Sequence, residues 1–348
     1  MKGSSVVGLD IGGANLKAAN ADGVAWSEVF EIWRAPGDLH RRLGTIFDRL
    51  APIARLAVTM TAELADCFAT KAEGVDFILA QVEEAAGNTP VSIWLTSGEF
   101  VDASEARRRP FDVAAANWHA LATWAGRLAP EGNALLLDIG STTSDLIPLR
   151  DGLPCPVGLT DVGRLVSREL VYTGVRRTPV CCIAPHVPFR GGDVPLAAEW
   201  FATMGDVHLL LGNLPEDCED CHTANGNPAT RDFACDRLAR AICCDRTEVT
   251  DDELLKIAAF LADQQRSQLL AAMSRVLDRV SGPLGAAIVS GAGEFLARQV
   301  LQSDRRNSVI PVTSLASALS SAATDAACAY AIAMLAFESA ASSTRRSP

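Results

Sequence analysis

The segment "LLLDIGSTTSDLI", residues 135–147, has the pattern of a buried strand, a turn and a second strand. Its first strand ends in Asp138, and a plain two-residue hairpin would then need only Asn-Gly or Asp-Gly. The turn that follows contains instead a glycine and three hydroxylated residues: Gly140, Ser141, Thr142 and Thr143. Backbone N–H groups and hydroxyls are therefore gathered between two carboxylates, Asp138 and Asp145.

The same pattern occurs once more near the N-terminus. Residues 8–19, "GLDIGGANLKAA", align without gaps with residues 136–147, "LLDIGSTTSDLI". In this alignment Asp10 matches Asp138. A chain that otherwise alternates strands and helices, and carries two such hairpins, is typical of a duplicated α/β architecture. We therefore predict two lobes that bring one hairpin each to a shared cleft.

The composition of the two turns suits a phosphate group. Glycine lets the backbone approach an anion closely, and successive N–H groups and hydroxyls can donate to its oxygens. Lys17, which aligns with Asp145, adds a positive charge for the same anion. The predicted phosphate-binding residues are Gly12, Gly13, Asn15, Gly140, Ser141, Thr142 and Thr143.

The two strand-end carboxylates indicate a cation. A carboxylate cannot bind phosphate directly, and Mg²⁺ is usually held by one or two carboxylates while it keeps several waters. We therefore predict that Asp10 and Asp138 hold Mg²⁺ through water. The alternative is that each Asp-Ile-Gly is only a strand end and a turn. Two matched copies favour the binding site.

A third element follows in residues 286–301, "AAIVSGAGEFLARQVL". It reads as a buried strand, a turn with Gly291 and Gly293, and a helix whose N-terminus faces the turn. Helix N-termini favour anions, although strand-glycine-helix junctions also serve packing alone. Its position after the two phosphate-type hairpins predicts an adenosine-type loop.

The length of 348 residues favours two lobes, which we place at residues 1–150 and 151–340. The first lobe holds both hairpins, at its start and at its end. The second lobe holds an irregular region rich in Pro and Gly and the third loop. Residues 341–348 are predicted to form a disordered tail.

The charge of the chain excludes some partners. The net charge of −11 argues against nucleic acid and against an anionic membrane surface. The N-terminus has no apolar stretch typical of a signal peptide, so we expect a cytoplasmic protein. The sequence leaves open whether it forms a homodimer.

The ten cysteines are then expected to be thiols. Cys218, Cys221 and His222 form a C-x-x-C-H pattern, which is typical of haem attachment or of three zinc ligands. Haem attachment requires export, and no second C-x-x-C completes a zinc site. We interpret these cysteines as loop thiols, and whether the three residues hold a metal stays open.

The ordered triple of loops resembles the actin-like, sugar-kinase and heat-shock-protein ATPase superfamily, and more closely its hydantoinase/oxoprolinase-like branch. Within that branch the chain resembles the family linked to tetrahydromethanopterin-dependent one-carbon transfer. The resemblance runs over nearly the whole chain and is carried by the segments "VVGLDIGGANLKAA", "MTAELAD", "LLLDIGSTTSDLIPL", "TGVRRTP", "MGDVHLLLG", "NPATRDFACDRLAR" and "VSGAGEFLA". It implies an actin-like (ribonuclease H-like) duplicated fold with two lobes around a phosphate-binding cleft.

Archaeal members of this family are similar to the synthase of methanofuran biosynthesis. The resemblance therefore implies a Mg²⁺-dependent transferase of methanofuran- or methylofuran-type cofactor assembly. It would join an aminomethylfuran methyl diphosphate to a tyramine- or tyrosine-type phenol and release diphosphate. Electrostatic stabilisation of the leaving group would come from the two turns, the metal and Lys17. The candidates for deprotonating the phenol are Asp138, Asp145, Glu63 and Asp66. For metal and base we select the first two, without dividing the roles between them.

Two other functions remain as alternatives. One is an ATP-dependent kinase or a hydantoinase/oxoprolinase-like ATPase of the same fold, and the other is an actin-like regulatory protein. Glu294 directly follows Gly293, and its carboxylate would oppose a nucleotide phosphate arriving there. A helix-capping role for Glu294 is equally open. Whether ATP binds is therefore left undecided.

Four further charged residues are candidates for contact with substrate. Glu63 and Asp66 follow a strand and begin a helix, although acids in a first helical turn are also common caps. Arg176 and Arg177 would bind either the diphosphate or a carboxylate of the acceptor, unless they are solvated loop charges.

Overall fold

The computed structural model describes residues 5–304 and 309–345. Its first sheet has the strand order β3-β2-β1-β4-β5-β6. The first three strands form an antiparallel meander, and β4 runs parallel to β1. The strands are β1 (Val6–Ile11), β2 (Asn15–Asn20), β3 (Ala25–Val29), β4 (Arg55–Met60), β5 (Val91–Trp94) and β6 (Phe100–Val101).

The second sheet repeats this arrangement, with the order β10-β8-β7-β13-β14 and with β9 paired to β8. Again a hairpin, β7–β8, is antiparallel, and the next strand in the sheet, β13, is parallel to β7. The strands are β7 (Asn133–Ile139), β8 (Ser144–Arg150), β9 (Leu153–Pro154), β10 (Leu170–Val171), β13 (Leu284–Ser290) and β14 (Val312–Ser314). The predicted duplicated, actin-like α/β fold is confirmed by this repeated strand order.

Helices cover both sheets because their apolar residues recur at helical spacing. In α1 (Leu39–Leu50), for example, Leu39, Leu43 and Ile46 are fully buried against the first sheet. The other helices of this part are α2 (Lys71–Ala86), α3 (Ala103–Arg108), α4 (Pro110–Val113) and α5 (Asn117–Ala125), with 3₁₀ turns at Pro36–Asp38 and Gly126–Leu128.

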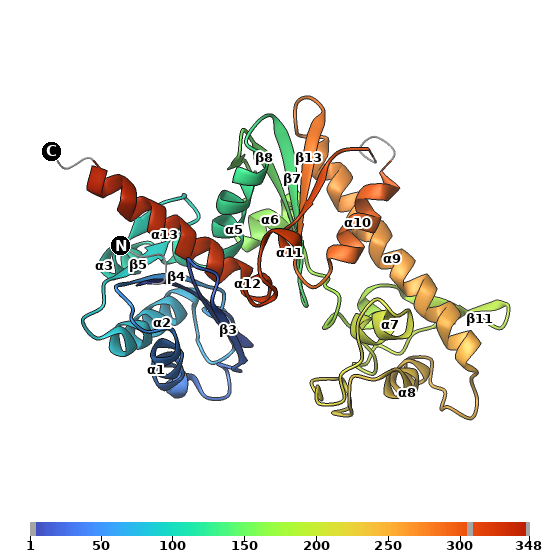
Figure 1. The fold of residues 1–348 in the computed structure, drawn as a ribbon. Helices are drawn as coiled ribbons and strands as arrows, with labels where there is room; N and C mark the ends of the chain where they lie inside the picture. The colour runs from blue at the N-terminus through green and yellow to red at the C-terminus, as the bar shows by residue number, and fades with distance from the viewer. Residues whose placement is uncertain (1–4, 305–308, 346–348) are drawn as a thin grey trace.

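The last helix, α13 (Ala327–Arg345), returns to the first sheet and packs along β1 (Figure 1). The contact is close because a Cβ atom at Gly8 of β1 would lie 2.0 Å from the carbonyl oxygen of Ala329. The helix reaches residue 345, five residues into the segment for which a tail is predicted, and residues 346–348 lie outside the described part of the chain. Among the described helices, none is long and apolar enough to cross a membrane.

The predicted lobe boundary at residue 150 falls within the second sheet, at the end of β8, since β8 pairs with β7, and β7 pairs with β13 rather than with the first sheet. The division into 1–150 and 151–340 stays a prediction. The remaining helices around the second sheet are α6 (Asp161–Ser167), α10 (Glu294–Ser303), α11 (Leu315–Ala318) and α12 (Ser321–Asp325).

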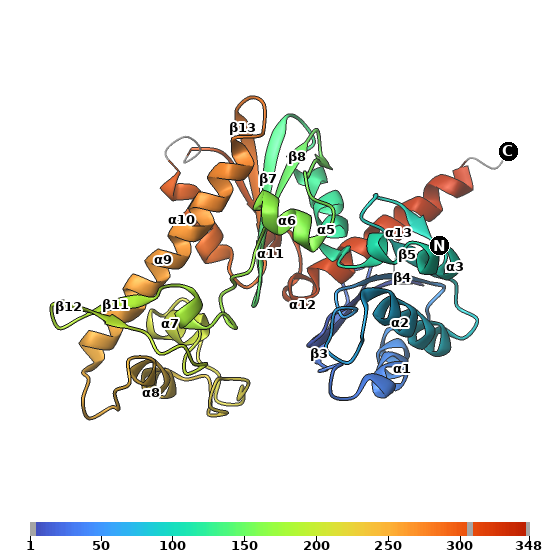
Figure 2. The same ribbon diagram turned by 180° about the vertical axis from the view of Figure 1, so that it is seen from behind.

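A largely helical segment follows β10 of the second sheet and has a hydrophobic core of its own. Figures 1 and 2 show it below that sheet, beside the lower half of α9 and across from β3. It consists of a 3₁₀ turn at Val180–Cys182, the hairpin β11 (His186–Phe189) and β12 (Gly192–Pro195), and the helices α7 (Met204–Leu210) and α8 (Arg231–Ala241). The first half of α9 (Asp251–Leu277) packs into the core of this segment, and its second half packs against the second sheet.

Candidate functional site

The two turns that the sequence aligns are also structurally equivalent. The N–H of Gly12 donates to the carbonyl of Asn15 at 2.9 Å, and the N–H of Gly140 donates to the carbonyl of Thr143 at the same distance. The strand registers match as well, because Asp10 faces Lys17 across the first hairpin and Asp138 faces Asp145 across the second. The repeat in the sequence is therefore a repeat in the fold.

The strand-end carboxylates of the two hairpins share one charged region, although they come from different sheets. The side chain of Asp10 is 8% exposed, and its Oδ1 has no hydrogen-bond partner among the described residues. Burial raises the pKa of Asp10, while the charge of Lys17 and a hydrogen bond from Asn117 act in the opposite direction. An orphaned, buried carboxylate oxygen of this kind is a suitable ligand for a cation.

Asp138 has a perturbed pKa for related reasons. Desolvation, followed by the negative charge of Asp145, raises the pKa of Asp138 to about 7. Lys17 and the side chain of Ser290 oppose the increase, and Asp10 adds to it. Perturbed carboxylates at the junction of two lobes are a common mark of a functional site.

Asp145 differs from the other two carboxylates because it has a fixed cationic partner. Its Oδ1 forms an ion pair with Arg164 of α6, whose side chain is 2% exposed. The guanidinium of Arg164 also lies 4.0 Å from the ring centroid of Trp118 in α5. Sequence reasoning missed both residues because neither belongs to a recognisable motif.

The third loop lies directly on the second hairpin. Gly291 has a φ of +86°, and a Cβ atom there would lie 2.3 Å from the carbonyl oxygen of Ile139 and 2.7 Å from Oδ1 of Asp138. The N–H of Gly293 donates to Ile139 at 2.8 Å. These glycines therefore allow the loop to approach the strand end that carries Asp138.

The carboxylate of Glu294 is hydrogen-bonded to the start of a neighbouring helix. Its carboxylate accepts a 2.6 Å hydrogen bond from Ser314 and a 3.1 Å bond from the N–H of Ala316, at the start of α11. The helix-capping interpretation therefore has structural support, with the difference that Glu294 caps α11 rather than its own helix α10.

A cavity of about 710 Å³ joins both turns to the helical segment. Asn15 and Ser141, one from each turn, line it, as do Arg176 and Arg177. The two arginines are tied to the second turn, because their N–H groups donate to the carbonyl of Ser141 at 3.1 and 2.9 Å. Other wall residues, which the sequence did not single out, are Ala14, Val29, Glu31, Arg34, Trp200, Thr203, Gly205, Asp206, Leu209, Leu214, Asp217, Glu219, Asp220, Thr223 and Ala229.

The acids of the "MTAELAD" segment lie elsewhere. Neither Glu63 nor Asp66 is among the residues that line the cavity, and Asp66 is exposed. Glu63 is 1% exposed, and burial raises its pKa to about 7. The charges of Lys71 and Asp161 act on it, and these two residues form a 3.0 Å ion pair between α2 and α6.

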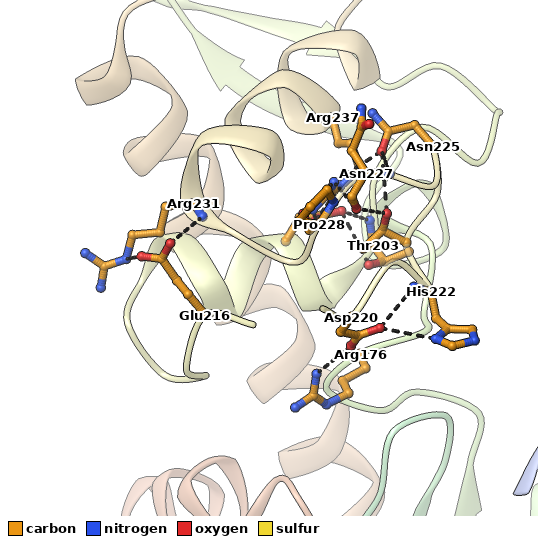
Figure 3. A network of polar contacts seen from close by, with 12 residues as sticks. Arg176, Thr203, Glu216, Asp220, His222, Asn225, Asn227, Pro228, Arg231 and Arg237 are labelled. Atoms are coloured by element: carbon orange, nitrogen blue, oxygen red, sulfur yellow. Dashed lines mark hydrogen bonds and ion pairs between the residues drawn. The ribbon is translucent and has the colours of Figure 1, made fainter. Parts of the chain in front are cut away.

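The C-x-x-C-H segment forms part of the cavity wall. Cys218, Cys221 and His222 are all exposed, and the last two line the cavity. His222 points its Nδ1 at Asp220, 3.3 Å away (Figure 3). Within the described ranges, no three His, Cys, Asp or Glu side chains are grouped so that they could hold a metal ion.

Comparison with known proteins gives a consistent set of relatives. Residues 55–330 match the protein-family model described as Hydantoinase/oxoprolinase. A curated protein of Methanocaldococcus jannaschii is 34% identical over 85% of this chain and 88% of its own length. It is named (4-{4-[2-(gamma-L-glutamylamino)ethyl]phenoxymethyl}furan-2-yl)methanamine synthase. A protein of the same name from Methanococcus vannielii is 30% identical over 49% of this chain and 75% of its own length.

Solved structures with a similar arrangement are more distant. The activator of 2-hydroxyisocaproyl-CoA dehydratase from Clostridium difficile, with bound ADPNP, is 12% identical, with 99% of this chain and 98% of that chain covered and a TM-score of 0.44. Component A of (R)-2-hydroxyglutaryl-CoA dehydratase from Acidaminococcus fermentans is 12% identical, with 97% of this chain and 98% of that chain covered and a TM-score of 0.45.

Proposed function

Because this chain belongs to the hydantoinase/oxoprolinase family, we propose that it is a transferase of methanofuran- or methylofuran-type cofactor assembly. The curated relatives are named for a product in which a phenol oxygen is joined to a furanylmethyl carbon. The observation that carries the proposal is the cavity that joins both turns to a charged, partly aromatic wall. Its volume of about 710 Å³ is in the ordinary range for small-molecule sites.

The proposed reaction forms one C–O bond and breaks another. The phenol oxygen of a tyramine- or tyrosine-type acceptor bonds to the methylene carbon of an aminomethylfuran methyl diphosphate. The bond from that carbon to the diphosphate oxygen breaks, and its electron pair leaves with the diphosphate. The phenol proton passes to a carboxylate. A furanylmethyl carbon tolerates positive charge, so that bond breaking can run ahead of bond formation.

The two turns are the proposed cradle for the diphosphate. Asn15 of the first turn and Ser141 of the second turn both line the cavity. Preorganised anion sites are commonly built from backbone N–H groups, and each turn contains such groups. Lys17, opposite Asp10 on β2, contributes positive charge from the first hairpin. Together they stabilise the charge that develops on the leaving group.

Asp10 and Asp138 are the residues that would hold Mg²⁺. The buried Oδ1 of Asp10, which has no partner among the described residues, supports this assignment. When bound, the ion would neutralise charge on the departing diphosphate.

The structure favours Asp138 among the four carboxylates considered for the phenol proton. Asp145 is bound by Arg164 and is better suited to orient its neighbours than to take up a proton. Asp138 interacts with the charges of both hairpins, Asp145, Lys17 and Asp10, whereas Glu63 interacts with Lys71 and Asp161, and Asp66 is exposed. We therefore assign proton acceptance to Asp138 and positioning to Asp145.

Phosphorus NMR on the purified protein with Mg²⁺ tests the proposal. One sample contains the aminomethylfuran methyl diphosphate and a tyramine- or tyrosine-type phenol, and a second contains ATP and the same phenol. The proposal predicts free diphosphate in the first sample and unchanged ATP in the second. ADP and phosphate in the second sample, with the furan diphosphate inert, would instead establish the ATP-dependent alternative.

A further inference from the structure

We propose that Arg176 and Asp220 form a subsite that recognises the zwitterionic head group of an amino-acid acceptor. The proposal rests on the transferase function above and adds a specificity determinant to it. The name of the curated relatives contains a gamma-L-glutamylamino group, which carries both an α-carboxylate and an α-amine.

The two residues meet across the cavity from different parts of the chain. Arg176 follows β10, and its backbone N–H donates to the carbonyl of Ser141 in the second turn, whereas Asp220 lies on the loop between α7 and α8. Nη1 of Arg176 lies 3.7 Å from Oδ2 of Asp220, and the side chains are 38% and 30% exposed (Figure 3). Both residues line the cavity.

A loose ion pair of this kind can exchange partners with a zwitterion. Partly exposed pairs contribute only about 0–1 kcal/mol, so separating this one costs little. A ligand carboxylate would replace Asp220 at the guanidinium, and a ligand ammonium would replace Arg176 at the carboxylate. Each charge then keeps an opposite partner, and no charge is left buried and unpaired.

The neighbouring wall suits the rest of such an acceptor. Trp200 also lines the cavity, and its side chain is 55% exposed, so that it offers an apolar surface to a phenol ring. Leu209 and Leu214 add buried aliphatic surface to the same wall. Ser141 of the second turn, where the proposed diphosphate binds, lines the same cavity.

The loop that carries Asp220 is held in place by a buried arginine. Arg237 of α8 is fully buried, and its Nε donates to Asp206 at 2.7 Å. Its Nη1 donates to Oδ1 of Asn225 at 3.2 Å and to the carbonyl of Asn227 at 3.4 Å (Figure 3). The carbonyl of Asp220 in turn accepts a 2.8 Å bond from the N–H of Ala229. The subsite is thus preorganised, which reduces the entropic cost of binding.

The imidazole of His222 also contacts Asp220, because its Nδ1 lies 3.3 Å from Oδ1 of that carboxylate.

Acceptor selectivity tests the subsite directly. The furan methyl diphosphate and Mg²⁺ are combined at pH 8 with one of five phenols, and kcat/KM is measured from diphosphate release. Tyrosine and gamma-glutamyl-tyramine carry both charges, tyramine only the ammonium, 3-(4-hydroxyphenyl)propionate only the carboxylate, and 4-methylphenol neither. We expect zwitterionic acceptors to exceed 4-methylphenol by roughly 10- to 100-fold, as charge-assisted hydrogen bonds allow.

Two variants separate carboxylate binding by Arg176 from ammonium binding by Asp220. Arg176→Gln should lower kcat/KM for the zwitterions by roughly 10-fold or more and leave tyramine and 4-methylphenol nearly unchanged. Asp220→Asn should lower the values for the zwitterions and tyramine and leave the propionate nearly unchanged. Arg190→Gln removes an arginine that pairs with Glu253 outside this cavity, and it should change none of the five values.

Failure of the proposed subsite can be distinguished from failure of the proposed transferase function. Equal use of tyrosine and 4-methylphenol by the unaltered protein would overturn the subsite, as would an equal loss for all five phenols in Arg176→Gln, which would place Arg176 on the diphosphate. No diphosphate from any acceptor would contradict the transferase function itself, and the subsite with it.

Discussion

At the scale of single residues, Asp138 is the point where three parts of the chain meet. It is the last residue but one of β7, faces Asp145 across the hairpin, and lies close to Gly291 of the third loop. Its charge is disfavoured by desolvation and by Asp145, so a neutral side chain of the same shape should be tolerated by the fold.

Asp138→Asn should therefore abolish turnover and leave the fold intact. We expect a loss of roughly 100-fold or more in diphosphate release, in the range of a removed general base. The free energy of unfolding, measured by urea denaturation, should not decrease by more than about 1 kcal/mol, because the buried negative charge is lost. Normal turnover in this variant would contradict the assignment of Asp138.

Glu63 should make the stability of the protein depend on pH. Burial raises its pKa from 4.5 to about 7, so between these values the folded state keeps a proton that the unfolded state has released. The contribution of Glu63 to the free energy of unfolding is therefore fully present below pH 4.5, and it is lost as the pH rises to about 7. The difference corresponds to about 3 kcal/mol.

Glu63→Gln removes that titration. Relative to the unaltered protein, the variant should gain stability as the pH is raised from 5 to 8, when both are unfolded with urea. Identical pH dependences would show that Glu63 does not carry the perturbed pKa.

At the scale of structural elements, the third loop depends on a glycine for two separate reasons. Gly291 and Gly23 have nearly the same φ, +86° and +87°, but Gly23 has open space where a Cβ atom would be placed. Gly23→Ala should then cost only the strain of positive φ, about 1–2 kcal/mol.

Gly291→Ala should cost clearly more, and it should also reduce diphosphate release, because its Cβ atom would displace the end of β7. Equal losses of unfolding free energy in the two variants would show that the close approach to Ile139 is not required.

The loop between α7 and α8 depends on the buried pair of Arg237 and Asp206. Arg237→Gln leaves the carboxylate of Asp206 buried without its cation, so we expect a loss of about 3–5 kcal/mol in unfolding free energy. Combining it with Asp206→Asn should restore part of that loss, because the unpaired charge is then removed. Strictly additive losses in the double variant would contradict a direct interaction between the two residues.

At the scale of the whole molecule, the sequence predicts those features that repeat locally. The two Asp-Ile-Gly turns predict the duplicated sheets because each is encoded within about twelve adjacent residues, and the strand order confirms the fold. The approach of the third loop to Asp138 also follows from glycines that are visible in the sequence.

Other features depend on residues that are distant in sequence and form no motif. Asn117 of α5 acts on Asp10, the charge of Asp10 acts on Cys328 of α13, and Arg164 of α6 reaches Asp145. The cavity wall around Trp200 and Asp220 comes from an irregular segment without strand or helix periodicity. Such contacts arise only once the two sheets and the helical segment are packed together.

The central claim is that the protein transfers a furanylmethyl group, by breaking the bond between carbon and oxygen, and does not transfer a phosphoryl group. It can be tested with an aminomethylfuran methyl diphosphate that carries ¹⁸O in the oxygen between carbon and phosphorus. Cleavage of the C–O bond places the label in the released diphosphate, where it shifts the phosphorus NMR signal, and the ether product contains only the unlabelled phenol oxygen. We predict that result. A label retained in a furanylmethyl alcohol, with unlabelled diphosphate released, would mean cleavage at phosphorus and would contradict the account.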